Sequence, residues 1–440
     1  MQVSVEVLDG LERRMTVQLP AKRVDGEVQK RLNDLSRRIR IDGFRPGKVP
    51  MKVVKKRYGE QVRAEVVTEL LRSSYTEALQ QEKLQPAGSP SIDLAPPVEG
   101  VDCEFKATFE VYPDVEIGGI EEIQISRPVG EVSDDDIERM LQTLRKQRRI
   151  WSPVERVSQD GDRLSIDFVG KIDGEVFAGG SSENFLVELG AGMTIPGFDA
   201  NLLGLSGGEE KTFEATFPDD YGNGALAGKT AEFQVKVTEV AESELPAMDE
   251  AFVKSFGVES GEIDALKDQL KDNMSRELDQ SIRTNIKDQV MEGILGRNEV
   301  AVPKALIDQE IRNLLQQSGA NLPEDSELTI TDPMREEYGD EARRRVALGL
   351  LVGEVIKGNE ITADDERVKQ HLETLAASYE HPEQVRTWYR QNPHALDGVR
   401  AMTLEEQVVD WVLQRAQVSD KESTFAEITK PGWEQENTRS

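Results

Sequence analysis

The sequence predicts a multidomain α+β protein with an N-terminal α+β domain, a middle domain built on an antiparallel β-sheet with a short helix, and an all-α C-terminal domain. The 440 residues are enough for about three domains. Strand and helix patterns mix before residue 113, and short glycine-rich strands recur between residues 164 and 237. Beyond Pro246, apolar residues recur almost throughout at helical spacing.

The N-terminal domain begins with two runs of alternating apolar residues, at positions 3–7 and 15–19. Asp9-Gly10 between them predicts a β-hairpin. Apolar residues from Val28 to Ile39 then follow a helical spacing, with Asp25 as the expected N-cap.

A second long helix is predicted from Glu60 to Glu82. Strict alternation from Cys103 to Val111 predicts a half-buried strand, which completes a domain over residues 1–113.

Between the two helices lies a loop from Ile41 to Pro50 that contains two glycines and two prolines. Glycine opens backbone conformations closed to other residues, and proline fixes φ. The two glycines are Gly43 and Gly47, and the two prolines are Pro46 and Pro50. We expect the loop to present Phe44 and Arg45 to solvent; the alternative is a surface connection whose phenylalanine folds back into the core.

Charge is distributed unevenly along the chain. The net charge is −29, but residues 22–57 hold 13 basic and 4 acidic side chains. Residues 1–112 carry 19 Lys and Arg against 17 Asp and Glu, which leaves 35 against 66 for the remainder. A basic patch on an acidic protein predicts one local docking site for an anionic partner.

Several classes of protein are disfavoured by composition. No apolar run approaches the ~20 residues that span a bilayer, and the N-terminus lacks a secretory pattern, so we expect a cytoplasmic protein that does not enter a membrane. Cys103 is the single cysteine, which excludes an intramolecular disulfide. The three histidines lack metal-ligand spacing, and Gly224–Thr230 has the wrong spacing for a phosphate loop. We expect no metal and no cofactor.

Residues 114–150 are predicted to form a connecting arm. Acidic residues at 134–136 open a helix that ends in basic residues at 145–149, an arrangement that suits the helix dipole.

The middle domain, residues 151–245, follows with short strands and glycines. Three motifs stand out there: Ile166-Asp-Phe-Val-Gly170 with Asp173-Gly-Glu-Val-Phe177, Gly190-Ala-Gly-Met-Thr-Ile-Pro-Gly-Phe198, and Phe217-Pro-Asp-Asp-Tyr-Gly222.

Residues 246–418 are predicted to be helical, beginning with a stripe from Ile263 to Ile294 that exceeds an average helix. A packed helical bundle explains most such stripes. From residue 419 onward the chain is polar, and we expect a disordered tail over 419–440.

The loop closely resembles the ribosome-docking signature Gly-Phe-Arg-x-Gly-x-x-Pro of the trigger factor family of bacterial chaperones. Pro46 stands where some relatives have lysine. The resemblance implies docking beside the exit tunnel of the large ribosomal subunit, on protein and ribosomal RNA. It assigns that contact to Gly43, Phe44, Arg45, Pro46, Gly47 and Lys48.

The three motifs of the middle domain resemble the FKBP-type peptidyl-prolyl isomerase domain in order and spacing. The resemblance implies a pocket in which the Ile195 N–H holds the substrate carbonyl, Phe198 forms the floor and Tyr221 lies at the rim. The matching positions are Phe168, Phe177, Phe185, Ile195, Phe198, Tyr221 and Phe233. Ala178 departs from the aspartate of many relatives, and the alternative for the aromatic set is the core of a small sheet.

Together these likenesses imply an ATP-independent, partly ribosome-bound chaperone that binds nascent and unfolded polypeptides, assists export and isomerises prolyl bonds. Its C-terminal domain would form a cradle with two arms, and a homodimer is implied for the free protein. Two alternatives stay open: a stand-alone isomerase without ribosome docking, and a holdase whose pocket is inactive.

Overall fold

The computed structural model describes residues 2–39, 44, 49–94, 98, 100–319, 330–377 and 379–430. The chain divides into two compact units. One comprises Met1–Arg127 with Arg283–Lys421, and the other comprises Pro128–Ile282 with Glu422–Ser440.

The N-terminal region of the first unit is an antiparallel sheet of order β1-β2-β4-β3. Its strands are β1 (Gln2–Val7), β2 (Glu12–Leu19), β3 (Ser91–Leu94) and β4 (Cys103–Glu110). The predicted hairpin is confirmed, because β1 pairs with β2 and Gly10 adopts the positive φ of 55° that its turn requires. Met15, Val17 and Phe105 are fully buried, and burial raises the pKa of the Cys103 thiol.

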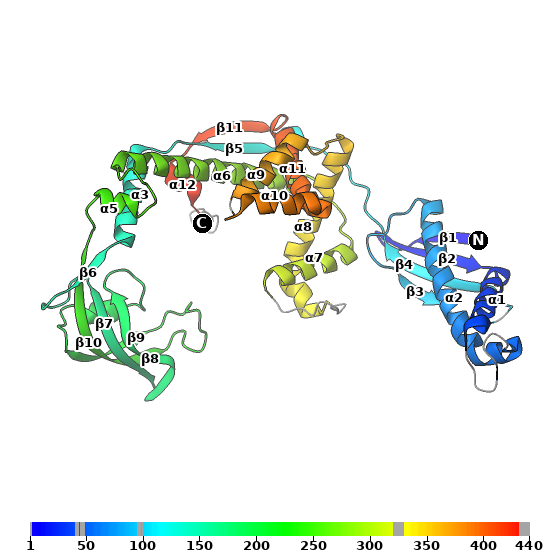
Figure 1. The fold of residues 1–440 in the computed structure, drawn as a ribbon, viewed down its shortest axis with the longest axis horizontal. Coiled ribbons are helices and arrows are strands. Elements are labelled where there is room, and N and C mark those ends of the chain that lie inside the picture. The colour runs from blue at the N-terminus through cyan, green and yellow to red at the C-terminus, as the bar shows by residue number, and fades with distance from the viewer. Residues whose placement is uncertain are drawn as a thin grey trace. The chain divides into compact units, whose positions relative to one another are not determined.

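Two helices, α1 (Ala21–Arg38) and α2 (Met51–Glu82), share a hydrophobic core with this sheet (Figure 1). Both begin earlier than predicted, because Pro20 and Pro50 are the N-cap residues and proline suits a helix start. Asp25 is therefore not the N-cap. Its carboxylate instead accepts a hydrogen bond of 2.7 Å from the Arg63 guanidinium on α2.

The first unit also contains most of the C-terminal helices. They are α7 (Lys304–Gln317), α8 (Asp332–Gly358), α9 (Asp365–Ala377), α10 (Pro382–Gln391) and α11 (Pro393–Leu413). α7 packs on α8, and α9 packs on α10 and α11. Helix α8 ends at Gly358, with Asn359 as the C-cap.

The second unit contains the predicted arm helix, α3 (Asp134–Gln147), whose start is fixed by a capping box between Ser133 and Asp136. α3 shares a core with α5 (Glu250–Lys254) and with the first half of α6 (Ile263–Arg297), a 35-residue helix whose second half belongs to the first unit.

The expectation of a disordered tail from residue 419 is wrong for residues 419–430. Strand β11 (Gln417–Glu422) pairs with β5 (Gln124–Val129), and helix α12 (Phe425–Thr429) follows. Phe425 and Ile428 are buried in the core formed by α3 and α6, and apolar burial stabilises a segment that looks polar on average. Residues 431–440 lie outside the described residues.

The middle sheet of the second unit is antiparallel, as predicted. Its strands are β6 (Ile150–Pro153), β7 (Arg163–Ile172), β8 (Glu175–Glu188), β9 (Glu210–Thr216) and β10 (Thr230–Glu244). The order is β6-β10-β7-β8, and β9 pairs with β10. A short helix, α4 (Phe198–Leu202), contributes Phe198 and Leu202 to the core between helix and sheet.

Candidate functional site

Aromatic rings from three strands and one helix converge on Phe233 in β10. The ring centroids of its neighbours lie 5.2 to 6.4 Å from its own, within the range of favourable aromatic pairs. These neighbours are Phe168, Phe177, Phe198, Phe213 and Phe217. The Phe198 ring lies perpendicular to Phe233, at an interplanar angle of 89°.

Strand register explains this convergence. Phe233 is paired with Phe213 on β9 and with Gly170 on β7. A Cβ atom at Gly170 would lie 2.7 Å from the Phe233 ring and 2.9 Å from the Phe177 ring. Only glycine at this position therefore lets the two rings approach the sheet so closely.

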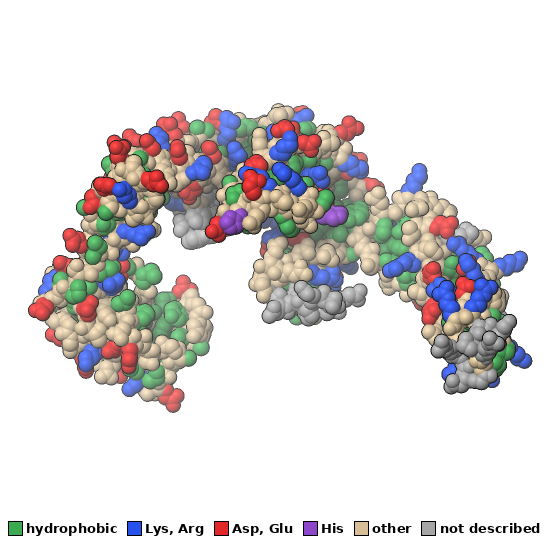
Figure 2. Space-filling view, in the orientation of Figure 1, with side chains coloured by type: hydrophobic (Ala, Val, Ile, Leu, Met, Phe, Trp, Pro, Cys, Tyr) green, Lys and Arg blue, Asp and Glu red, His purple; other side chains and the backbone are tan. Residues whose placement is uncertain are grey.

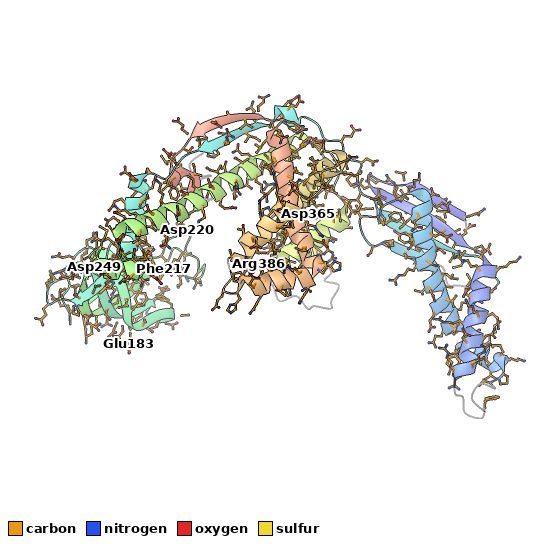
Figure 3. All side chains as sticks on the ribbon, turned by 45° about the horizontal axis from the view of Figure 1, so that its top comes forward. Glu183, Phe217, Asp220, Asp249, Asp365 and Arg386 are labelled. Atoms are coloured by element: carbon orange, nitrogen blue, oxygen red, sulfur yellow. The ribbon has the colours of Figure 1, made fainter. Side chains whose placement is uncertain are left out.

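The aromatic set has a buried floor and an exposed rim. Phe198 and Phe233 are buried, whereas Phe185 is 45% exposed and Tyr221 is 39% exposed. The Phe185 ring lies edge-on to the Phe168 ring, with centroids 5.5 Å apart. The centroids of the Tyr221 and Phe217 rings are 4.8 Å apart, and Phe217 is labelled in Figure 3. We call this set of rings, together with Ile195, the aromatic bowl.

Ile195 contributes the backbone donor of the aromatic bowl. Its side chain packs against the core, and its carbonyl accepts a hydrogen bond of 3.1 Å from the Phe198 N–H. The Ile195 N–H donates to no acceptor within the described part of the chain. An amide donor beside apolar rings can bind a carbonyl oxygen of a polypeptide.

The structure brings the predicted pocket positions into one region of the second unit. Their chemical roles stay predictions. The sequence interpretation missed Phe213 and Phe217 as members of the bowl, although the alternation of apolar residues along 211–217 already pointed both rings to one face. Position 178 is an exposed alanine, which contributes no carboxylate to the bowl.

A partly buried ion pair, between the half-buried Arg156 and the buried Asp162, supports the sheet that carries the bowl. The Arg156 guanidinium donates to both carboxylate oxygens of Asp162, at 2.5 and 3.0 Å. Burial alone would raise the pKa of Asp162, but the bonds from Arg156 and from the Gln159 N–H outweigh it and lower that pKa. Asp162 is therefore a structural anion.

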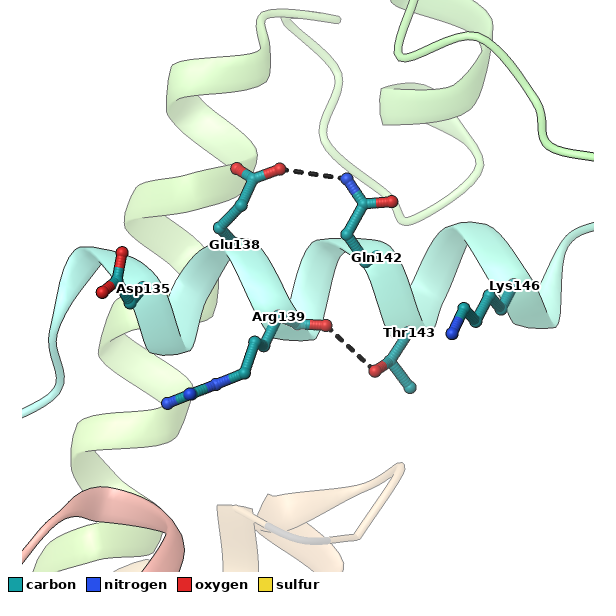
Figure 4. A pocket seen from close by; sticks show the side chains of 6 residues that line it. All are labelled: Asp135, Glu138, Arg139, Gln142, Thr143 and Lys146. Carbon is teal, nitrogen blue, oxygen red and sulfur yellow. Dashed lines mark hydrogen bonds between the residues drawn. The ribbon is translucent and has the colours of Figure 1, made fainter.

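A separate hollow of about 510 Å³ runs along α3 (Figure 4). Its lining consists of polar and charged side chains from that one helix, with Gln142 donating to Glu138 at 3.1 Å and the Thr143 hydroxyl donating to the Arg139 carbonyl at 3.0 Å. It contains none of the aromatic bowl residues and offers no convergent catalytic groups.

Among the predicted docking residues Gly43–Lys48, the structure describes Phe44, which is 39% exposed. Gly43, Arg45, Pro46, Gly47 and Lys48 lie outside the described residues. The flanking helices present a basic surface, and Figure 2 shows Lys and Arg side chains gathered over this region. The exposed basic residues of these helices nearest the loop include Arg37, Arg38, Lys52, Lys55, Lys56 and Arg57.

Among the helices the structure describes, none combines the length and the apolar character that crossing a bilayer requires. Within the same residues, no group of three or more His, Cys, Asp or Glu side chains is arranged to hold a metal ion.

Comparisons with known proteins match most of the chain. Residues 1–144 match the family model of the bacterial trigger factor protein, and residues 262–414 match the model of its C-terminus. Residues 154–238 match the model of FKBP-type peptidyl-prolyl cis-trans isomerases. This last match contains the whole aromatic bowl.

Similar proteins cover nearly the whole length. The trigger factor of Stutzerimonas stutzeri is 47% identical over 435 residues, which are 98% of each chain. That of Alkalilimnicola ehrlichii is 45% identical over 98% of this chain and 96% of its own. A solved structure reported as "Promiscuous Substrate Recognition in Folding and Assembly Activities of the Trigger Factor Chaperone" shares the fold, with a TM-score of 0.51 and 20% identity over 94% of this chain and 99% of its own. The chain belongs to the bacterial trigger factor family and carries an FKBP-type peptidyl-prolyl isomerase domain.

Proposed function

We infer that this protein is an ATP-independent, ribosome-associated chaperone that binds nascent polypeptides and isomerises their prolyl bonds. The observation that carries the enzymatic part is the aromatic bowl around Phe233, with an Ile195 N–H that donates to no acceptor among the described residues. Membership of the trigger factor family over the whole length supports the chaperone part.

The reaction needs no nucleophile. Rotation about a peptide bond faces a barrier of ~18–20 kcal/mol because resonance keeps the amide planar. Removing the prolyl carbonyl from water withdraws the hydrogen bonds that favour the planar, charge-separated form. A dry pocket that binds the twisted imide better than either planar state therefore accelerates the rotation.

The residues of the bowl have distinct proposed roles. Phe198 and Phe233 form the floor against which the proline ring packs, and their burial keeps that floor dry. The Ile195 N–H binds a substrate carbonyl. Tyr221 offers its hydroxyl at the rim, and Phe185 covers the adjoining residue of the substrate.

For ribosome docking, we propose that Phe44 and Arg45 contact the large subunit beside the exit tunnel. The basic side chains of α1 and α2 then attract the phosphates of ribosomal RNA. The acidic remainder of the chain is repelled from the same RNA, which confines contact to this surface. In this account the protein is cytoplasmic, and it forms a homodimer when it is free of ribosomes.

Client binding is proposed for exposed apolar side chains of the C-terminal helices and of the connection between α9 and α10. Tyr379, Trp388 and Met402 are each more than half exposed. Exposed aromatic and methionine side chains provide adaptable apolar contacts for unfolded chains.

Two alternative functions differ from this proposal in one activity each. A stand-alone isomerase would lack ribosome binding, and a holdase with an inactive pocket would lack isomerase activity.

The enzymatic part is tested with a prolyl peptide and the Phe198→Ala/Tyr221→Phe double variant of the full chain. We expect kcat/KM to fall by at least about tenfold, because the floor and the rim are both altered. A matched control, Phe252→Ala/Tyr112→Phe, removes one buried ring and one exposed hydroxyl outside the bowl and keeps wild-type activity. Equal activity of the two variants would refute the pocket assignment.

A further inference from the structure

We propose that Asp199 is a positioning residue for the isomerase reaction, because its carboxylate fixes the loop that presents the Ile195 N–H. This inference rests on the proposed isomerase function. Asp199 follows the floor residue Phe198 directly, in the first turn of α4. Its side chain is half-buried, and both of its oxygens accept hydrogen bonds from the preceding loop.

The carboxylate binds the loop at two places. Asp199 Oδ1 accepts from the Thr194 hydroxyl, and Oδ2 accepts from the Gly190 N–H at 3.3 Å. The loop from Gly190 to Ile195 is therefore tied at both ends to a single side chain. Hydrogen bonds to a charged acceptor are among the stronger ones in proteins.

The anchor itself does not move easily. The Phe198 ring lies 5.2 Å from both the Phe213 and the Phe233 ring, so the backbone that carries Asp199 is held by the buried floor. At the other end of the loop, Gly190 adopts a φ of 80°, and a Cβ atom there would lie 2.1 Å from Asp160 Oδ1. The Leu189 N–H, just before Gly190, donates to the Asp162 carbonyl at 2.9 Å, so the start of the loop is held as well.

These contacts determine the direction of the Ile195 N–H. That N–H belongs to the peptide bond between Thr194 and Ile195. The Thr194 side chain is bound to Asp199 on one side of this peptide, and the Ile195 carbonyl accepts from the Phe198 N–H on the other. Without the carboxylate, the Phe198 bond alone would restrain the peptide, and the donor would sample other directions.

A positioning role and a merely stabilising role give different kinetics. The Ile195 N–H binds the substrate carbonyl in the planar and in the twisted state alike, so misdirecting it raises KM while kcat changes little. A substitution that only unfolds part of the protein lowers the amount of active enzyme, which lowers the apparent kcat and leaves KM unchanged.

The experiment compares full-length wild type, Asp199→Ala, Asp199→Asn and the control Glu209→Ala in a prolyl-peptide assay. Glu209 is a matched control because its carboxylate also accepts a loop N–H, that of Ser206 at 2.9 Å, outside the aromatic bowl. We expect Asp199→Ala to raise KM about tenfold, because two hydrogen bonds are lost. Asp199→Asn keeps an acceptor for one of the two donors and gives an intermediate KM. Glu209→Ala leaves KM unchanged.

The outcomes separate this inference from the function on which it rests. An inactive wild-type protein overturns the isomerase function. An active wild type whose KM rises no more in Asp199→Ala than in Glu209→Ala overturns the positioning role alone. If the alanine variant fails to fold, the isosteric Asp199→Asn variant decides, and a wild-type KM in that variant is the contradicting result.

Discussion

The Phe198 ring stands edge-on to the Phe233 ring, with centroids 5.2 Å apart and planes at 89°. One ring comes from the short helix α4 and the other from strand β10, so this contact joins helix to sheet. The same two side chains form the core of the middle domain and the floor of the proposed pocket. Stability and substrate binding are therefore coupled at the floor and separable at the rim.

Replacing Phe233 with alanine should destabilise the middle domain strongly. The ring is buried among other rings, and large-to-small substitutions of buried aromatics cost about 3–5 kcal/mol. Urea unfolding followed by a signal from the middle domain measures this change. A loss below about 1 kcal/mol would mean that the packing around Phe233 does not hold the domain together.

Replacing Phe185 with alanine should separate activity from stability. The ring lies at the rim and is 45% exposed, so its removal costs little folding free energy. We expect the unfolding free energy to change by less than about 1 kcal/mol, and KM for a prolyl peptide to rise several-fold. An unchanged KM would remove Phe185 from the binding surface.

Gly170→Ala tests the close approach of rings to the sheet. The added methyl group would lie 2.7 Å from the Phe233 ring, and such overpacking costs about 1–3 kcal/mol. Gly224→Ala is the matched control, because nothing lies within 4 Å of its Cβ position. Equal midpoints of thermal unfolding for the two variants would contradict the packing described for the bowl.

The Arg156–Asp162 ion pair should make the stability of the folded protein sensitive to acid. The pKa of Asp162 is lowered in the folded state, so the ionised carboxylate contributes stability above its unfolded pKa of about 3.8–3.9, and this contribution is lost as the pH falls through the folded pKa. Asp162→Asn should therefore reduce stability at pH 7 and flatten its decline below pH ~4. Unfolding curves recorded between neutral and acidic pH check this. If the unfolding free energy of variant and wild type fell equally steeply below pH ~4, the prediction would be contradicted.

Strand β11 and helix α12 should contribute measurably to the free energy of unfolding, although their sequence is polar on average. Phe425→Ala should lower the unfolding free energy by about 3 kcal/mol, because the ring is buried against α3 and α6. Ala426→Ser, at an exposed position of the same helix, serves as the control. If the two variants were equally stable, α12 would not be part of the core.

Sequence patterns predicted the elements more reliably than their ends. Alternation located the hairpin and β4, and helical spacing located α1 and α3. The start of α1 was misplaced at Asp25, because an acidic residue within a helix can pair with another helix, here through Arg63, as readily as it can cap. Mean polarity predicts a disordered tail from residue 419, but it hides two buried side chains spaced three apart, Phe425 and Ile428.

The aromatic bowl was predictable in membership but not in geometry. Its motifs identified most of the rings, since each motif is local in sequence. The contacts of Phe233 with Phe213 and Phe217 depend on strand register, and the hydrogen bonds of Asp199 depend on how the loop returns to α4. Neither follows from composition or periodicity.

The central claim is that the segment around the exposed Phe44 attaches an acidic chaperone to the ribosome, and pelleting with vacant ribosomes tests it most directly. Wild type is compared with Phe44→Ala/Arg45→Ala and with a matched control, Trp388→Ala/Arg390→Ala, which removes an exposed aromatic and a nearby arginine from α10. We predict that wild type and control co-sediment with ribosomes and that the loop variant stays in the supernatant with its fold intact. Undiminished co-sedimentation of the loop variant would contradict the account.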